Sequence, residues 1–491
     1  MARDVEIGVF RGIPYAEPPV GLLRFAAPVA RSPWVGELDA TRFGAVSMQP
    51  DSPMVLPDDV HSEDCLTLNV WAPTSATAAA AESLPVMVWF HGGGFTAGSS
   101  SFPWYDGARL ASRGVVVVTV NYRLGPLGFL HLEPFGGEEF AGAANNGLAD
   151  QTLSLRWVRD HIAAFGGDAG RVTVFGESAG AISVSCHLAM PTSAGLFRRA
   201  IAQSGSASLV HPSEVGEAVA QQVMDHLGIE RNNPAALRDL PASAFVDVQP
   251  YVRPHDGAAL PLPFGPTVDG QILRIDPLTA IEAGSADGVD LIVGTNLDEM
   301  DLFILLAQFM GQAEAVDAAL LERLLVKAIA ARGIEAPVSE VVGVYRRRLG
   351  DVSEQAVWSA IASDLMFRIP GIAMADAQRE HAEVRSYLYT HRSTGFGGLL
   401  GSAHSLEIPF VFENGTAYGA QILNGDLTPE REAFSERLAD AWTSFAIHGD
   451  PATEALGEWP LYGDTRTTLE LDLVSQLVDD PQRDERRIWL R

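Results

Sequence analysis

The chain has 491 residues, of which 47% are hydrophobic and 20% are charged, the balance of a globular protein with a large core. Its formal net charge of −28 excludes the basic surface that a nucleic-acid partner requires, and it disfavours anionic membranes and strongly anionic substrates. The two cysteines, Cys65 and Cys186, are too few for a disulfide framework.

The N-terminal sequence contains no apolar stretch typical of a secretory signal, and no apolar run approaches the roughly 18 residues of a membrane span. Sparse thiols also fit a reducing compartment. We therefore expect a cytoplasmic protein with no membrane partner. The length could hold two or three average domains, but large α/β enzymes reach the same size as one unit.

The first hundred residues lead from loops into a buried strand. Residues 8–50 are rich in proline and glycine, which favours short strands and ordered loops over long helices. Residues 65–71 alternate as a strand does, and 85–90 form an apolar run typical of a buried parallel strand. This run leads into His91 and three glycines at 92–94, whose backbone N–H groups could point into a cavity, as an oxyanion hole requires.

A dinucleotide-binding loop is the alternative for these glycines, because Gly92, Gly94 and Ala97 match that fingerprint after a strand. However, residues 98–103 do not open a helix, and the next apolar strand, 115–120, ends at an asparagine instead of an acidic residue. The sequence therefore favours an oxyanion loop, and we expect no cofactor.

The most informative motif is the turn Gly176-Glu177-Ser178-Ala179-Gly180. A β-branched run precedes it, and residues 181–185 continue as an apolar helical segment. A Gly-x-Ser-x-Gly turn between strand and helix is the context of a nucleophile elbow, which lifts a serine hydroxyl clear of the sheet. An ordinary glycine–serine turn is the alternative.

The surrounding pattern predicts an α/β fold. A helix over 150–165 precedes the elbow strand, so strands and helices alternate, which implies a mostly parallel sheet with the site at the carboxyl ends of its strands. The remaining expectations, in chain order, are helices within 212–245, a buried strand at 290–296, long helices over 301–385, a last core strand at 385–390 and a closing amphipathic helix at 430–448. We interpret 301–385 as a helical insertion between sheet strands.

A serine nucleophile needs a histidine base and a carboxylate that orients the histidine. In an α/β hydrolase the acid follows the serine in the chain and the histidine comes last. Asp298, Glu299 and Asp301 all follow the 290–296 strand, and spacing does not rank them.

Four histidines follow these acids: His381, His391, His404 and His448. His381 lies in a charged helical stretch, and His448 ends a helix. His404 lies in a glycine-rich loop that is better able to place an imidazole over Ser178, but the pattern alone does not decide between the histidines. His391 directly follows a strand and stays a rival on pattern alone.

The chain resembles the type-B carboxylesterases, the α/β-hydrolase family that includes bacterial para-nitrobenzyl esterases and the cholinesterases. The resemblance covers nearly the whole chain. It is carried by residues 12–16, 18–21, 63–66, 91–95, 121–123, 165–168, 175–180, 294–296, 298–299, 404, 407–410 and 441–446.

The resemblance implies a role for each motif residue. It makes Ser178 the nucleophile, Glu299 the acid and His404 the base. It also implies oxyanion-hole N–H groups from Gly93, Gly94 and Ala179, and polar groups behind the triad from Glu177, Ser204 and Glu407. Simple packing and turn chemistry are the alternative for these last three.

Two departures from the family pattern bear on compartment and substrate. Where many relatives carry a cysteine, this chain has Ser47, so the N-terminal disulfide loop to Cys65 cannot close. No tryptophan occurs between these positions, so the aromatic platform that cholinesterases use for quaternary ammonium is missing. Choline esters are therefore not the expected substrate.

Taken with the resemblance, the sequence predicts one α/β-hydrolase unit over 1–491 that cleaves carboxylic esters through an acyl-enzyme. We expect no metal, a monomeric protein, and a small-molecule ester substrate that is neutral or cationic rather than anionic. An amide or carbamate hydrolase with the same triad is one alternative, and a catalytically inactive binding module is another.

Overall fold

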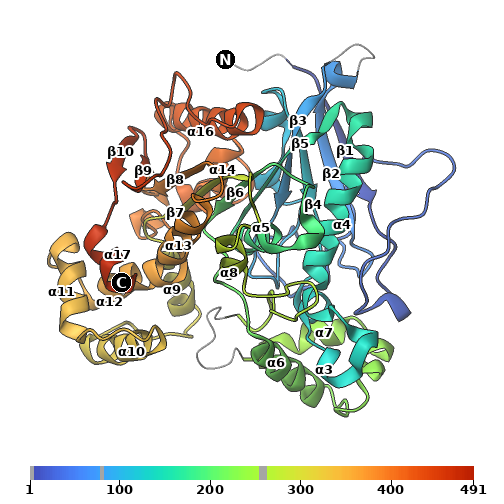
Figure 1. The fold of residues 1–491 in the computed structure, drawn as a ribbon, viewed down its shortest axis with the longest axis horizontal. Helices are drawn as coiled ribbons and strands as arrows, with labels where there is room; N and C mark the ends of the chain where they lie inside the picture. The colour runs from blue at the N-terminus through green and yellow to red at the C-terminus, as the bar shows by residue number, and fades with distance from the viewer. Residues whose placement is uncertain (1–4, 78–81, 254–261, 491) are drawn as a thin grey trace.

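A ten-stranded sheet runs through the protein, whose computed structural model describes residues 5–77, 82–253 and 262–490 (Figure 1). The order across the sheet is β1-β2-β4-β3-β5-β6-β7-β8-β9-β10. The strands are β1 (Ile7–Pro14), β2 (Thr67–Pro73), β3 (Leu84–Phe90), β4 (Val116–Val120), β5 (Gly167–Glu177), β6 (Arg199–Gln203), β7 (Asp290–Asn296), β8 (Val384–Tyr389), β9 (Thr467–Leu471) and β10 (Gln476–Asp479).

The strands from β4 to β9 in this order are parallel, and antiparallel pairs close both edges. β4 is buried along its whole length and consists of valine and threonine, as expected for a strand covered on both faces. The expected mostly parallel sheet flanked by helices is confirmed. In the register, Phe90 at the end of β3 pairs with Gly176 near the end of β5, which brings the glycine loop beside the serine turn.

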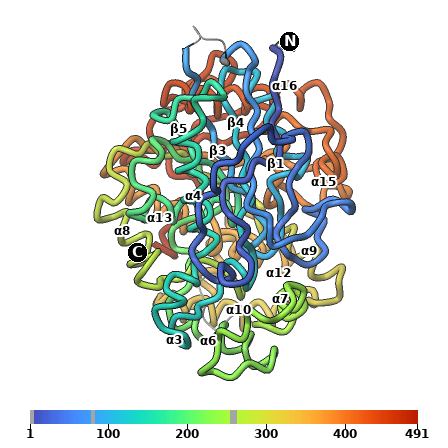
Figure 2. Tube along the Cα trace, turned by 90° about the vertical axis from the view of Figure 1, so that its right-hand side faces the viewer, coloured from blue at the N-terminus to red at the C-terminus, as the bar shows by residue number. Residues whose placement is uncertain are grey.

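Helices cover both faces of the sheet. They are α1 (Ala108–Ala111), α2 (Gly125–Phe129), α3 (Glu133–Gly136), α4 (Asn146–His161), α5 (Ala179–Ala189), α6 (Ser213–His226), α7 (Ser243–Asp247), α8 (Pro277–Glu282), α9 (Met300–Phe309), α10 (Ala318–Ala331), α11 (Val338–Leu349), α12 (Glu354–Ser363), α13 (Ile369–Gln378), α14 (Ile408–Val411), α15 (Ala420–Asn424), α16 (Pro429–His448) and α17 (Arg483–Trp489). One buried cluster joins the sheet to α4, α5, α8 and α13, and a second joins it to α14 and α16. Figures 1 and 2 place α16 at one end of the molecule and α3, α6 and α10 at the other.

The long helices expected over 301–385 are α9 to α13, which lie between β7 and β8 in the chain. They have a buried cluster of their own, which includes Leu325 and Tyr345 and also takes in Trp489 of α17. The Trp489 indole N–H donates to the Tyr345 hydroxyl at 2.8 Å, so α17 packs against α11 and stabilises this group of helices.

The prediction that 385–390 is the last core strand is wrong, because β9 pairs with β8 in parallel and β10 follows it. β9 reads Thr-Thr-Leu-Glu-Leu, and both its threonines and its glutamate interrupt the apolar pattern. Near the sheet edge such polar positions are tolerated, so the strand carries a weaker signal than the central strands.

Candidate active site

Ser178 lies at the sharp turn between β5 and α5, with backbone angles φ 55° and ψ −122°. A Cβ on Gly180 would lie 1.9 Å from the Phe90 carbonyl oxygen, and one on Gly176 would lie 2.5 Å from the Gly180 carbonyl carbon. Only glycine therefore allows β3, β5 and α5 to approach this closely. The strained serine conformation is stabilised by its amide, which donates to the Gln203 carbonyl at 2.9 Å.

Of the three candidate acids, Glu299 is the one that contacts a histidine. Its Oε2 lies 2.6 Å from His404 Nδ1, and its Oε1 accepts a 2.7 Å hydrogen bond from the Asn296 amide at the end of β7. Both side chains are buried. A carboxylate held in this way fixes the imidazole so that Nε2 is left for other partners.

The other two acids face elsewhere. Asp298 accepts from the Ser402 amide at 3.0 Å and pairs with the exposed Arg392 at 3.2 Å. Asp301 accepts a hydrogen bond from the Ser359 hydroxyl. The contacts therefore distinguish Glu299 from two other carboxylates that sequence spacing does not rank.

The rival histidine, His391, is occupied on both ring nitrogens. Its Nδ1 lies 2.7 Å from Asp472 Oδ1, and its Nε2 accepts from Arg431 Nε at 3.1 Å. It does not line the cavity that contains Ser178 and His404. These contacts indicate a structural role, in which His391 ties β8 to α16.

The three expected oxyanion-hole residues, Gly93, Gly94 and Ala179, line the same cavity as Ser178 and His404. Gly93 and Gly94 have φ values of 107° and 61°, and a Cβ on Gly93 would lie 2.1 Å from the Ala97 carbonyl oxygen. Ala179 is the first residue of α5, where free amides and the helix dipole favour negative charge. The loop and the helix start are therefore suited to holding an oxyanion.

Two of the three polar residues expected behind the triad are hydrogen-bonded close to it. Glu177 Oε1 lies 3.1 Å from His404 Nε2 and accepts a 2.5 Å hydrogen bond from the Ser405 hydroxyl. Glu407 accepts from Gln203 Nε2 at 3.0 Å and from Asn296 Nδ2 at 2.7 Å.

Ser204 contributes through its backbone, since its amide donates to the Gly294 carbonyl at 2.9 Å. Its hydroxyl is buried and makes no hydrogen bond with the described residues. Ser405, by contrast, was not among the sequence candidates. The only sequence signal for it is a hydroxyl residue directly after the histidine.

Burial and charge shift the ionisation of the site. Burial raises the pKa of Glu177 to about 8, although His404 and the Ser405 hydroxyl oppose the shift. Burial lowers the pKa of His404, but the carboxylates of Glu177 and Glu299 outweigh it and raise that pKa to about 9. Burial and the charge of Glu299 raise the pKa of Glu407. The neighbouring carboxylates therefore favour the imidazolium, the form that His404 takes once it has accepted a proton.

The cavity around Ser178 measures ≈ 760 Å³ and is mainly apolar. Its acidic and basic lining residues, within the described part of the chain, are Glu177 and His404. The rings of Phe303 and Phe367 lie 5.0 Å and 4.8 Å from the His404 ring. No sequence motif marked these two aromatic residues, since both come from the helical region between β7 and β8.

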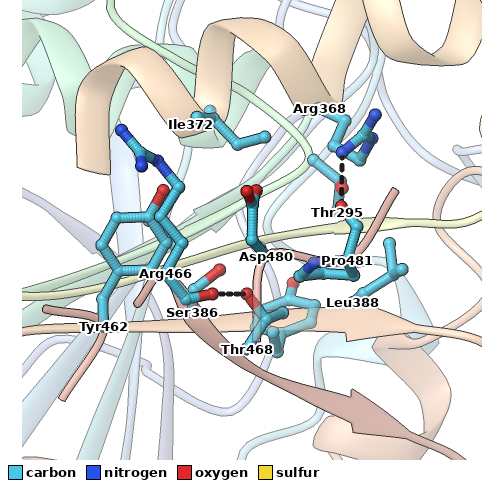
Figure 3. A pocket seen from close by; sticks show the side chains of 14 residues that line it. Thr295, Arg368, Ile372, Ser386, Leu388, Tyr462, Arg466, Thr468, Asp480 and Pro481 are labelled. Atoms are coloured by element: carbon cyan, nitrogen blue, oxygen red, sulfur yellow. Dashed lines mark hydrogen bonds between the residues drawn. The ribbon is translucent and has the colours of Figure 1, made fainter. Parts of the chain in front are cut away.

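A second cavity, ≈ 30 Å³, lies between α13 and the strands β7, β8 and β9 (Figure 3). Figure 3 shows Arg368, Tyr462, Arg466 and Asp480 around it, and Arg368 donates to the Pro481 carbonyl at 3.2 Å. It has room for about one water molecule. None of the predicted site residues lines it.

Within residues 5–77, 82–253 and 262–490, no group of three or more histidine, cysteine, aspartate or glutamate side chains is placed to hold a metal ion. Over the same ranges, no helix has the length and apolar character to cross a membrane.

The chain is similar to known proteins over almost its full length. The profile of the carboxylesterase family matches residues 1–489. The para-nitrobenzyl esterase of Bacillus subtilis (strain 168) is 39% identical over 486 residues, 97% of this chain and 94% of that protein. An acylcarnitine hydrolase of Mus musculus is 36% identical over 496 residues, 96% of this chain and 84% of that protein.

Solved structures agree with this similarity. A Geobacillus stearothermophilus carboxylesterase structure at pH 6.2 has a TM-score of 0.86 at 37% identity, covering 98% of this chain and 96% of that one. A structure of a PNB esterase has a TM-score of 0.85 at 35% identity, covering 99% of this chain and 96% of that one.

Proposed function

The chain belongs to the carboxylesterase family and is a carboxylic ester hydrolase, and from this premise we propose that Ser178, Glu299 and His404 form its catalytic triad. The observation that carries the proposal is the 2.6 Å contact between His404 Nδ1 and Glu299 Oε2 inside the cavity that Ser178 lines. Glu299 follows the end of β7, and His404 lines the cavity. The chain order Ser178, Glu299, His404 is that of the α/β hydrolases.

The proposed reaction proceeds through an acyl-enzyme. Ser178 Oγ attacks the ester carbonyl while His404 Nε2 takes its proton, and Glu299 stabilises the imidazolium. The amides of Gly93, Gly94 and Ala179 hold the oxyanion. His404 then protonates the leaving alcohol and activates a water molecule that releases the acid and frees Ser178.

The proposed substrate is a small-molecule ester that is neutral or cationic rather than anionic. Two observations support this part of the proposal. The cavity walls are apolar around Glu177 and His404, and the net charge of −28 repels anions at a distance. We also propose that Glu177, Ser204 and Glu407 form a set of polar groups behind the triad.

We further propose one catalytic unit over 1–491, acting as a monomer in the cytoplasm. The sheet supports the single unit, because strands from both ends of the chain, β1 and β10, belong to the same sheet. The free thiols of Cys65 and Cys186 support a reducing compartment.

The triad is tested by Ser178→Ala, which should lower kcat for a nitrophenyl ester by a factor on the order of 10⁴ to 10⁶ because the nucleophile is lost. Circular dichroism should be unchanged. An organophosphate should label Ser178 in the wild type, and mass spectrometry locates the label.

The matched pair of histidine variants completes the test. His404→Ala should be comparably damaging, whereas His391→Ala should keep most of the activity, since His391 contacts Asp472 and Arg431. Labelling of another serine, or a reversed order of the two histidine variants, would refute the assignment.

A further inference from the structure

Helix α9 follows the acid directly and carries apolar side chains outward. Its sequence, Met-Asp-Leu-Phe-Ile-Leu-Leu-Ala-Gln-Phe, contains two polar residues, yet none of its ten residues is buried. Phe309 is 88% exposed, and Met310, the next residue, is also exposed. Large apolar side chains gathered on one exposed helix mark a binding surface.

One face of this helix connects the catalytic histidine with the surface. Phe303, Leu306 and Met310 follow each other at helical spacing, so they share a face, with Phe309 beside them. The Phe303 ring lies 5.0 Å from the His404 ring, and Phe303 and Leu306 line the cavity although they are 39% and 45% exposed. We call these four residues the α9 stripe.

Another part of the cavity lining is also apolar and exposed. Tyr418 and Ile422 line the cavity and are exposed. The Trp104 indole N–H donates to the Tyr418 carbonyl at 2.8 Å, and Asn414 Nδ2 donates to the Trp104 carbonyl at 2.9 Å. These hydrogen bonds hold this part of the lining in place.

We propose that the α9 stripe binds the hydrocarbon chain of long-chain carboxylic esters whose carbonyl lies at Ser178. The inference rests on the proposed function and names its substrate class. This ligand is favoured because the α9 stripe is continuous with the cavity and begins beside His404. A group that covers the stripe from end to end is therefore part of the ester that is attacked at Ser178. A partner protein docked on the outside would not account for the inner half of the stripe.

The dimensions fit an extended alkyl chain. From Phe303 to Met310 the helix advances roughly 10 Å, at about 1.5 Å per residue. A chain that follows the stripe therefore gains contacts with several methylenes beyond those enclosed by the cavity. Each methylene removed from water favours binding by up to about fourfold.

The experiment measures kcat/KM for nitrophenyl esters from acetate to dodecanoate, all below their critical micelle concentrations. In the wild type, kcat/KM should rise with chain length up to dodecanoate. In Phe309→Ser and Met310→Ser, the ratio of kcat/KM for dodecanoate to that for butanoate should fall about tenfold, equivalent to roughly two methylenes.

Val474→Ser is the matched control, because Val474 is 86% exposed but lies between β9 and β10, away from the cavity lining. Its ratio should equal that of the wild type. A wild-type preference that falls beyond butanoate, or an unchanged ratio in both α9 variants, would overturn the inference.

Size-exclusion chromatography supplies a further outcome that would overturn it. A wild-type dimer that Phe309→Ser converts to a monomer would make the stripe a contact between copies. Failure of the proposed function looks different, because Ser178→Ala would then retain activity toward butanoate.

Discussion

At the scale of single residues, the Glu299–His404 contact distinguishes one carboxylate from two close neighbours. Glu299→Gln should keep the side-chain shape but remove the charge that stabilises the imidazolium. We expect kcat/KM for a short nitrophenyl ester to fall by about 10² to 10⁴. Asp298→Asn and Asp301→Asn should cost far less, because these carboxylates pair with Arg392 and Ser359. Equal losses at 298 and 299 would assign the effect to the turn.

A second prediction at this scale concerns Ser405, a half-buried residue whose hydroxyl donates a hydrogen bond to the buried Glu177. Burial raises the pKa of Glu177, and the Ser405 hydroxyl opposes this shift, so Ser405 favours the charged carboxylate. Charged Glu177 in turn raises the pKa of His404. Because neutral His404 is the proposed base, we expect kcat/KM to fall as the pH drops below that pKa. Removing the hydroxyl should therefore move the acid limb of the pH profile to lower pH.

Ser405 has a φ of 67°, which glycine adopts without strain and alanine does not. Ser405→Ala and Ser405→Gly both remove the hydroxyl but differ in backbone strain. Equal shifts of the acid limb in the two variants would identify the hydroxyl as the cause. A shift toward higher pH in both would contradict the prediction.

At the scale of elements, the approach of α5 to β3 limits what the serine turn accepts. Gly180→Ala places a Cβ 1.9 Å from the Phe90 carbonyl oxygen, so a strand or a helix must move. We expect a loss of stability at or beyond about 3 kcal/mol, or failure to fold. The control is Gly343→Ala in α11, where the nearest atom lies 4.0 Å away and alanine favours the helix. Thermal unfolding measures both, and equal melting temperatures would refute the clash.

The central elements could be predicted from the sequence because each of them is defined locally. β3 is apolar throughout, β5 and β7 contain the short runs Val-Thr-Val-Phe and Leu-Ile-Val, and the glycines of the serine turn lie at fixed spacing from Ser178. β9 was missed because its polar residues are acceptable only beside β8, about eighty positions earlier in the chain.

The choice between His391 and His404 could not be made from spacing for a related reason. Which imidazole faces the cavity depends on the path of the loop between β8 and α14, and the family resemblance supplied the preference. Ser405 was missed because its partner, Glu177, lies 228 positions away in the chain. Such contacts exist only after the sheet has brought the strand ends together.

At the scale of the whole molecule, the two thiols should report the redox state directly. Cys65 and Cys186 are both free and buried, so a maleimide should modify them only after unfolding, and reductant should not change the melting temperature. The engineered control is Ser47→Cys, because Ser47 and Cys65 are both buried and line the same small cavity. A bridge there should stabilise the fold by roughly 3 kcal/mol under oxidising conditions only. A 65–186 linked peptide in the wild type would contradict the prediction.

The order of strands also has a consequence for synthesis on the ribosome. By the time α16 has emerged, Ser178, Glu299 and His404 have all been translated, yet the outer edge of β8 still lacks β9. An open parallel edge is a template for association between nascent chains. Residues 467–490 cover that edge with β9 and pack Trp489 against Tyr345. A message cut short after α16 would therefore yield a polypeptide with the whole proposed triad and a strong tendency to aggregate, so the codons for residues 467–490 protect a site that earlier codons have already specified.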